Sequence, residues 1–398
     1  MNLFRYNLGA PNFGATLVMA TAVSFCFGDP AQASINDLYV VGGNNTAYVV
    51  RTNSQGVPQG VVRTIALGNC PQAARVSPDR TQVWVVNGCD ATVTAINTST
   101  YATQTFPVGT AGTNFPTFLA FSPVSNAAYV IDGNTNQVLF FDTYTHTQTG
   151  TVGVGNTPGY AAVTPNGARL YVTNYFDNSV SVVNTYSKSI ITTIVLPNTN
   201  PPGTSTPPND SVDGCSATSL ESVSPPSPQG VAASADGNYV YVVNGYSANL
   251  SPCKNGGNGD IPFQQSTVNV ISTWSNTIVG TVLTGGDSAD FPAFSPDGSK
   301  LYVTNTGNDD YPLTTIGVLN ASSRSGGPRA VITLPNGWSG PTEVDTDPDP
   351  RDNLVYVATD QNGVAAVNTL SNAVVGQVPL VDTTNGAFPT SIAVVRRW

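Results

Sequence analysis

The feature that most constrains the fold of this 398-residue chain is a repeated unit of roughly 40–45 residues. The clearest copies are residues 71–109 and 158–197. Each begins with a strand of small residues and a turn resembling Ser-Pro-Asp-Gly. A strand rich in Tyr and Val follows, which ends in Asn or Asp, and two more alternating strands complete the unit. Aligning the second strands places an aromatic residue at seven positions: Tyr39, Trp84, Tyr129, Tyr171, Tyr241, Tyr302 and Tyr356. Four short strands at this period predict an all-β fold, a seven-bladed β-propeller.

The two ends of the chain predict how this ring closes. Residues 34–67 supply the second, third and fourth strands of a unit but no first strand. The last segment, residues 386–398, supplies a first strand with nothing after it. Pairing the two completes the seventh blade and removes two exposed sheet edges. We therefore predict four-stranded antiparallel blades, closed by pairing the C-terminal strand with the N-terminal blade.

Several segments resemble the YVTN β-propeller repeat of exported bacterial and archaeal proteins. These are LYVTN, which occurs at residues 170–174 and 301–305, and the longer phrases SPDGSKLYVTNTGN and TPNGARLYVTNYFDNSVSVVN. The resemblance covers essentially the whole chain after residue 33. It implies the propeller fold and a place among surface-layer-like and periplasmic proteins. Related propellers include lactonase-like enzymes, and some exported propellers serve as subunits of redox complexes.

The N-terminus predicts export. Arg5 precedes an apolar stretch at residues 15–27, and residues 31–33 (AQA) are small where a signal peptidase cuts. We predict a signal peptide at residues 1–33 and a single propeller domain at residues 34–398. No later segment is apolar enough to cross a membrane. The protein is expected to be periplasmic, secreted or on the cell surface, as a monomer.

Charge limits the classes of partner. The formal net charge is −10, and the 14 Lys and Arg residues are scattered apart from Arg396 and Arg397. Nucleic acids and anionic membranes need basic clusters, so neither is favoured. A protein, a glycan or a small molecule is the expected partner.

Loop lengths distinguish the two faces of the ring. The connections between first and second strands and between third and fourth strands are short. Both long insertions, at residues 198–227 and 245–266, fall on the opposite face, which we call the long-loop face. Long loops on a rigid scaffold commonly carry function, so we expect the binding site on this face.

The cysteines predict two disulfides. Removal of the signal peptide takes away Cys26 and leaves an even number, which in an oxidising compartment indicates disulfides. Cys70 and Cys89 lie symmetrically about the turn at residues 79–80, so they should face each other across an antiparallel pair. Cys215 and Cys253 lie in the two insertions and form the second predicted pair.

Candidate site residues come from the long-loop face. The strand-ending Asn and Asp residues are explained either as turn residues or as a ring of polar ligands around a shared mouth. The ligand-binding candidates are Asn87, Asp132, Asn174, Tyr175, Asn244, Tyr246, Asn305, Asp309, Asp310 and Trp338. Four carboxylates, which could converge on a divalent cation or an amine-bearing ligand, are the metal candidates: Asp287, Asp290, Asp309 and Asp310.

Three other features are interpreted as structural. The acidic run at residues 342–353 is expected to be a solvated turn, with a Ca²⁺ site as the alternative. His146, the only histidine, is expected in a solvated turn on the short-loop face. Three Phe-Pro pairs, and Trp338 at an equivalent place, are expected to precede first strands and to act as wedges between blades, or else to form an aromatic rim for a sugar or apolar ligand. The pairs begin at Phe115, Phe291 and Phe388.

Together these observations favour a non-catalytic binding or protein-interaction module that uses the long-loop face. The sequence has no histidine cluster, nucleophile motif or cofactor fingerprint. The alternative is a lactonase-like hydrolase with carboxylates and Ca²⁺ or another divalent cation at the propeller mouth. A third possibility is a subunit of a larger redox complex.

Overall fold

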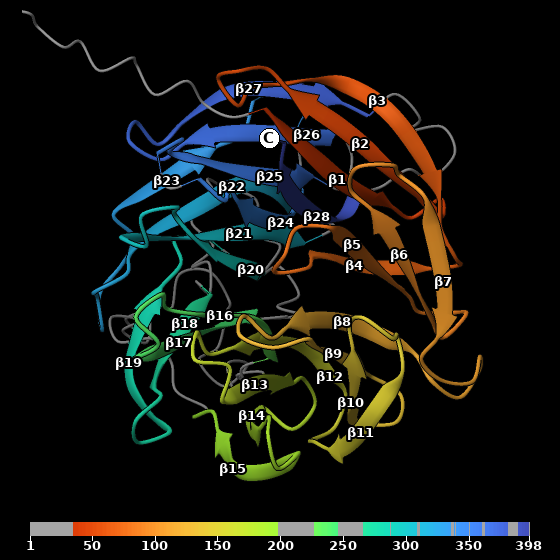
Figure 1. Ribbon diagram of the computed structural model, residues 1–398. Helices are drawn as coiled ribbons and strands as arrows, with labels where there is room; N and C mark the ends of the chain where they lie inside the picture. The colour runs from red at the N-terminus through yellow and green to blue at the C-terminus, as the bar shows by residue number, and fades with distance from the viewer. Residues whose placement is uncertain are drawn as a thin grey trace, which may run out of the picture. The chain divides into compact units, whose positions relative to one another are not determined.

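The computed structural model describes residues 35–197, 227–245, 266–286, 288–308, 311–335, 338, 340–349, 351–359, 363–380 and 389–397. These residues form 28 strands and no helix. The strands build seven four-stranded antiparallel sheets, arranged as the blades of a ring (Figure 1). The predicted seven-bladed β-propeller is therefore confirmed.

We number the blades in chain order. Blade 1 contains β28 (Pro389–Arg396), β1 (Asn36–Gly42), β2 (Thr46–Thr52) and β3 (Pro58–Ala66), and blade 2 contains β4 (Pro71–Val76), β5 (Gln82–Asn87), β6 (Thr92–Asn97) and β7 (Thr103–Pro107). Blade 3 contains β8 (Pro116–Phe121), β9 (Ala127–Asp132), β10 (Gln137–Asp142) and β11 (Gln148–Gly153), and blade 4 contains β12 (Pro158–Val163), β13 (Arg169–Asn174), β14 (Ser179–Asn184) and β15 (Ser189–Val195). Blade 5 contains β16 (Ser227–Ala233), β17 (Tyr239–Gly245), β18 (Thr267–Ser272) and β19 (Thr277–Leu283). Blade 6 contains β20 (Ala289–Phe294), β21 (Lys300–Asn308), β22 (Tyr311–Asn320) and β23 (Ala330–Thr333), and blade 7 contains β24 (Pro341–Thr346), β25 (Leu354–Thr359), β26 (Gly363–Asn368) and β27 (Ala373–Pro379).

The first strand of each blade lies nearest the ring's centre. Each contacts the first strand of the next blade, and the cycle closes where β28 meets β4. These strands are rich in small residues, as in PQAARV of β4 and PGYAAV of β12. Small side chains allow seven strands to approach one another, so this position explains their composition.

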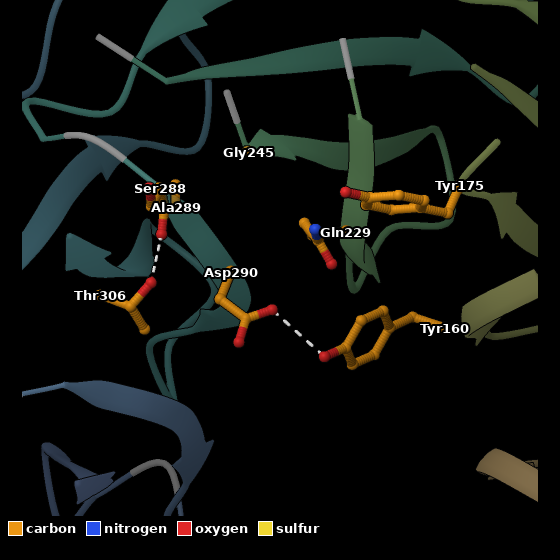
Figure 2. A pocket seen from close by; sticks show the side chains of 8 residues that line it. All are labelled: Tyr160, Tyr175, Gln229, Gly245, Ser288, Ala289, Asp290 and Thr306. Atoms are coloured by element: carbon orange, nitrogen blue, oxygen red, sulfur yellow. Dashed lines mark hydrogen bonds between the residues drawn. The ribbon is translucent and has the colours of Figure 1, made fainter. Parts of the chain in front are cut away.

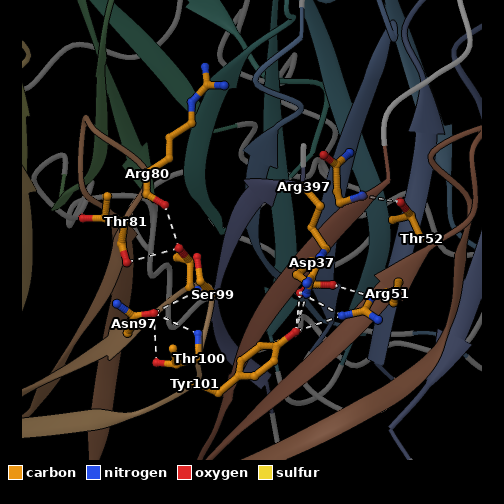
Figure 3. Close-up of polar contacts among 12 residues, drawn as sticks. Asp37, Arg51, Thr52, Arg80, Thr81, Asn97, Ser99, Thr100, Tyr101 and Arg397 are labelled. Atoms are coloured by element: carbon orange, nitrogen blue, oxygen red, sulfur yellow. Dashed lines mark hydrogen bonds and ion pairs between the residues drawn. The ribbon is translucent and has the colours of Figure 1, made fainter.

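The C-terminal strand closes the ring as predicted. β28 pairs antiparallel with β1, with Tyr39 opposite Ala393. Beside this pair, the buried carboxylate of Asp37 binds Arg51 at 2.8 Å and Arg397 at 2.6 Å. It also accepts a hydrogen bond from the Tyr101 hydroxyl at 2.7 Å (Figure 3). Residues from both ends of the chain and from blade 2 therefore meet at one carboxylate.

The seven aligned aromatic residues all lie in second strands and are at most 2% exposed. Several of their hydroxyls reach the turn between the third and fourth strands of the next blade. Tyr171 donates to Asn276 Oδ1 at 2.7 Å, and Tyr302 donates to Asn372 Oδ1 at 3.0 Å. The repeated tyrosine thus joins neighbouring blades rather than forming a binding site.

His146 occupies the equivalent turn in blade 3, as expected, but its side chain is half-buried rather than fully solvated. Its ring stacks on Phe106 with centroids 4.5 Å apart and meets Trp84 edge-on at 5.2 Å. Blade 2 has Trp84 in place of the repeated tyrosine, so it has no hydroxyl to reach the turn of the next blade. The imidazole ring of His146 packs against the indole of Trp84 instead. Burial lowers the pKa of His146, although Asp142 opposes this shift.

The disulfide between Cys70 and Cys89 is confirmed, with Cα atoms 5.3 Å apart. It joins the segment that leads into β4 to the end of β5 on the long-loop face. The predicted signal peptide, most of the two long insertions, and Cys215 and Cys253 lie outside the described residues. Within the part of the chain that the structure describes, no helix has the length and apolar character needed to span a bilayer.

Candidate functional site

The candidate site lies in the central channel, which is lined by one equivalent residue from each first strand. In six of the seven strands this residue follows a proline, and in β20 it follows Ala289. The pairing with the second strand shifts register at this point in every blade, as a β-bulge does when it redirects a side chain. The seven residues that line the channel here are Gln72, Thr117, Gly159, Gln229, Asp290, Thr342 and Thr390.

A cavity of about 220 Å³ opens on the long-loop face, and we call it the mouth cavity. Its walls come from blades 4, 5 and 6 (Figure 2). The residues that line it are Tyr160, Tyr175, Gln229, Gly245, Ser288, Ala289, Asp290 and Thr306. Hydroxyl, amide and carboxylate groups therefore surround the space together with two tyrosine rings.

A second cavity, of about 350 Å³, lies next to the first, and we call it the inner cavity. Tyr160 and Asp290 line both cavities and so mark the boundary between them. Phe118 and Phe291 also line the inner cavity, with ring centroids 6.2 Å apart, and each packs against Tyr160. The mouth cavity is thus mainly polar, whereas the inner cavity contains an aromatic cluster.

Asp290 is the carboxylate at the boundary of the two cavities. It accepts a hydrogen bond from the Tyr160 hydroxyl at 3.2 Å. Burial raises the pKa of Asp290 to about 6, while the bond from Tyr160 opposes the increase. The carboxylate is consequently ionised at neutral pH, although it is only partly exposed to solvent.

Glu343 is the second carboxylate of the channel, and it is paired. Arg75 lies 2.6 Å from its carboxylate, and the guanidinium stacks over the rings of Phe118 at 4.3 Å and Phe291 at 5.1 Å. Burial raises the pKa of Glu343 to about 7, against the lowering effect of Arg75. The positive charge of Arg75 is thus committed to Glu343 and to the aromatic cluster.

The acidic run that contains Glu343 is not the expected solvated turn. Glu343 and Asp345 belong to β24, the first strand of blade 7, and Glu343 is only 5% exposed. Asp347 and Asp349 are also buried; Asp349 pairs with Arg351 at 2.7 Å. Glu343 and Asp345 thus lie in the strand and Asp347 and Asp349 in the turn that follows it, and protein groups, including arginines and backbone N–H groups, provide the solvation that water was expected to provide. Among the described residues, no group of three or more His, Cys, Asp or Glu side chains is placed to hold a metal ion.

The strand-ending residues bond within their own blades. Asn87, Asp132, Asn174, Asn244 and Asn305 are buried, and none of them lines either cavity. The Asn174 amide, for example, donates to the Ser179 and Ser181 hydroxyls of the third strand at 2.9 Å each.

Of the other candidates, Tyr175 and Asp290 line the mouth cavity. Trp338 is buried in the hydrophobic core. The candidates that lie outside the described residues are Tyr246, Asp287, Asp309 and Asp310.

The expected equivalence of the Phe-Pro pairs is wrong. Phe115 precedes β8, but Phe291 is the third residue of β20 and faces the inner cavity. Phe388 lies outside the described residues. When the first strands are aligned, Phe291 corresponds to Phe118 of β8, so the two Phe-Pro pairs are three positions apart and Phe115 and Phe291 are not equivalent.

Several residues of the channel were not identified from the sequence. Arg75, Tyr160 and Gln229 are large or charged residues in first strands that otherwise contain mostly small or apolar residues. Phe118 lies in the apolar strand β8, and Glu343 shares β24 with Asp345. A large or charged residue in a first strand could have indicated the channel. It does so only when the first strands are known to be the innermost ones.

Comparison with known proteins supports the fold. The sequence model of the family described as "Lactonase, 7-bladed beta-propeller" matches residues 80–206. Among curated proteins, none matches this sequence. The structure resembles a hydrazine synthase from Kuenenia stuttgartiensis with a TM-score of 0.59 and 16% sequence identity, over 88% of this chain and 96% of that chain. This likeness concerns the fold alone, so the class that these findings define is the seven-bladed β-propeller.

Proposed function

We propose that this chain is an exported, non-catalytic binding protein that takes up a small polar ligand in the mouth cavity of its long-loop face. The observation that carries the proposal is the cavity itself. Its volume is about 220 Å³, and it is lined by two tyrosine rings and several hydrogen-bonding groups from three blades. A concave site with a few converging polar groups is the usual form of a small-molecule site. The disulfide between Cys70 and Cys89 supports export, because such bonds persist in oxidising compartments.

A filling substitution tests this proposal. Gln229 lies in β16 and lines the mouth cavity, so Gln229→Trp should occupy much of the space. Ligands found by screening a small-molecule library against the wild-type protein should bind this variant at least about tenfold more weakly, a loss of about 1.4 kcal/mol. Isothermal titration calorimetry measures the difference.

The matched control is Gln148→Trp, on the exposed outer strand β11 of blade 3. It introduces the same side chain away from the channel and should leave the affinities unchanged. Library ligands that bind both variants as tightly as the wild type would show that the mouth cavity is not the binding site.

Lactone hydrolysis is the second candidate function. The observation that favours it is the pair of carboxyl groups, Asp290 and Glu343, whose pKa values of about 6 and about 7 suit proton transfer near neutral pH. The lactonase-family match ends at residue 206 and so includes neither of them. Release of acid from a γ-lactone in a pH-stat, lost in both Asp290→Asn and Glu343→Gln, would favour hydrolysis and contradict the non-catalytic proposal.

A further inference from the structure

We propose that the ligand of the mouth cavity is a small organic cation, with its ammonium group on Asp290 and its apolar part against Tyr160 and Tyr175. This inference rests on the function proposed above and specifies the chemical class of the ligand.

The first argument is the charge of Asp290. Its hydrogen-bond partner is the Tyr160 hydroxyl at 3.2 Å, and no Lys, Arg or His of the described residues forms an ion pair with it. The guanidinium of Arg75, which stacks over Phe291 next to Asp290 in the chain, is bound to Glu343 at 2.6 Å. A partly buried carboxylate without a positive partner is less favourable than a paired one. A ligand that carries an ammonium group would supply the missing charge.

The second argument is the arrangement of the aromatic rings. Tyr160 comes from β12, and Tyr175 directly follows β13, so both stand on the blade 4 side of the cavity. Asp290 comes from β20 on the blade 6 side, and its carboxylate points toward Tyr160 (Figure 2). Cations bind favourably to the faces of aromatic rings, particularly where water is partly excluded. A carboxylate opposite two tyrosines therefore suits an organic cation better than a neutral molecule.

The third argument is the chemistry of the remaining lining groups. The Thr306 hydroxyl donates to the backbone carbonyl of Ser288 at 2.6 Å, so its oxygen remains an acceptor for the N–H groups of a ligand. Gln229 provides a further amide oxygen beside the two tyrosines. None of the eight residues that line the cavity is Lys, Arg or His. The lining therefore favours a cation over an anion.

Cavity size and long-range charge agree with this class of ligand. A volume of about 220 Å³ corresponds to roughly seven water molecules, so the ligand should have about that number of heavy atoms or a few more. The formal net charge of −10 attracts cations toward the protein as a whole.

The test uses three probes of the same shape and different charge: benzylammonium, benzyl alcohol and benzoate. Titration calorimetry on the full exported chain should show that benzylammonium binds at least about tenfold more tightly than benzyl alcohol, with benzoate weakest. Asp290→Asn keeps the size of the side chain and removes its charge. It should weaken benzylammonium binding at least about tenfold and change benzyl alcohol binding by less than about twofold.

The matched control is Asp177→Asn. Asp177 is exposed on the same long-loop face, where it accepts a hydrogen bond from the Asn156 backbone, and it does not line the cavity. This change alters the net charge equally and should leave benzylammonium affinity within about twofold, which separates a local ion pair from long-range attraction.

The outcomes distinguish this inference from the proposed function. If benzyl alcohol or benzoate binds as tightly as benzylammonium, and Gln229→Trp abolishes that binding, the mouth cavity is the binding site but the ligand is not a cation. Equal losses in Asp290→Asn and Asp177→Asn, or no binding of benzylammonium, would also overturn the inference. If the probes and the library ligands all bind Gln229→Trp as tightly as the wild type, both proposals are wrong.

Discussion

Two carboxylates in the same channel have different partners, and this difference gives them different roles. Glu343 is paired with Arg75 at 2.6 Å, and the guanidinium is in turn held against the rings of Phe118 and Phe291. Within the described part of the chain, the one hydrogen-bond partner of the Asp290 carboxylate is the neutral hydroxyl of Tyr160, at 3.2 Å. Glu343 is therefore part of the packing of the channel, whereas Asp290 is the group to which we assign the proposed ligand.

The unpaired charge of Asp290 predicts a pH-dependent stability. Burial raises its pKa from 3.8 to about 6. Between about pH 4 and pH 6, the folded protein keeps a proton at Asp290 that the unfolded chain has lost. The contribution of this group to the free energy of unfolding therefore falls as the pH rises through that window, and it stays low above it. Asp290→Asn should stabilise the empty protein at pH 8 and have little effect at pH 3.5.

The size of this effect follows from the pKa difference. The full shift corresponds to roughly 3 kcal/mol, and water in the channel should reduce the gain to about 1–2 kcal/mol. Urea unfolding of wild-type and variant protein at both pH values measures it. Tyr160 and Glu343 line the same channel, and Asp345 is buried within range of the Arg75 charge. All four groups are present in both proteins, so the difference between the two isolates Asp290. A loss of stability at pH 8 would contradict the unpaired charge.

At the scale of the element, the second strand joins the rest of the blade and the next blade. Its tyrosine reaches the following blade, as Tyr171 reaches Asn276 at 2.7 Å. Its final Asn fixes the turn toward the third strand. Asn174 donates to Ser179 and Ser181 and accepts from the Gly155 N–H at 3.1 Å. The recurring LYVTN phrase is thus explained by contacts within and between blades.

Asn174→Ala should destabilise the protein by about 2–3 kcal/mol. The change removes the buried amide and leaves the Gly155 N–H and the two serine hydroxyls without this partner. The midpoint of urea unfolding measures the loss. Asn156→Ala, an exposed amide in the same blade, is the control and should change stability by less than about 0.5 kcal/mol. Equal effects of the two changes would show that the strand-end amide has no special structural role.

At the scale of the whole molecule, one strand determines whether the ring is closed. β28 is the innermost strand of blade 1 and pairs with β1. It also packs beside β4 and β24, the first strands of the neighbouring blades. Arg397, which follows β28, binds Asp37 together with Arg51 and Tyr101 (Figure 3).

Deletion of residues 389–398 should therefore abolish cooperative folding. The deletion exposes the edge of β1 and leaves Asp37 without Arg397, and an exposed strand edge promotes aggregation. Size-exclusion chromatography with light scattering should detect aggregates, and urea unfolding should lose its single sharp transition. A chain that ends at residue 397 is the control and should remain folded. A monomeric, cooperatively folded protein without β28 would contradict the role of this strand in closure.

The sequence by itself determined the blades, the ring closure and the Cys70–Cys89 disulfide. These features depend on short-range patterns: alternating strands, turn residues and two cysteines symmetric about a hairpin. The strand and turn patterns are repeated from blade to blade, so the copies support one another. The tertiary structure alone decided that Glu343 belongs to a strand rather than a turn, because an acidic stretch rich in Asp and Pro is compatible with both.

The tertiary structure also decided the composition of the channel. Arg75, Tyr160, Asp290 and Glu343 come from the first strands of blades 2, 4, 6 and 7. Nothing local in the sequence links them. They meet only because seven first strands surround one axis, and a bulge in each strand fixes which side chain faces the channel. The unpaired charge of Asp290, on which the proposed ligand depends, is a consequence of that meeting.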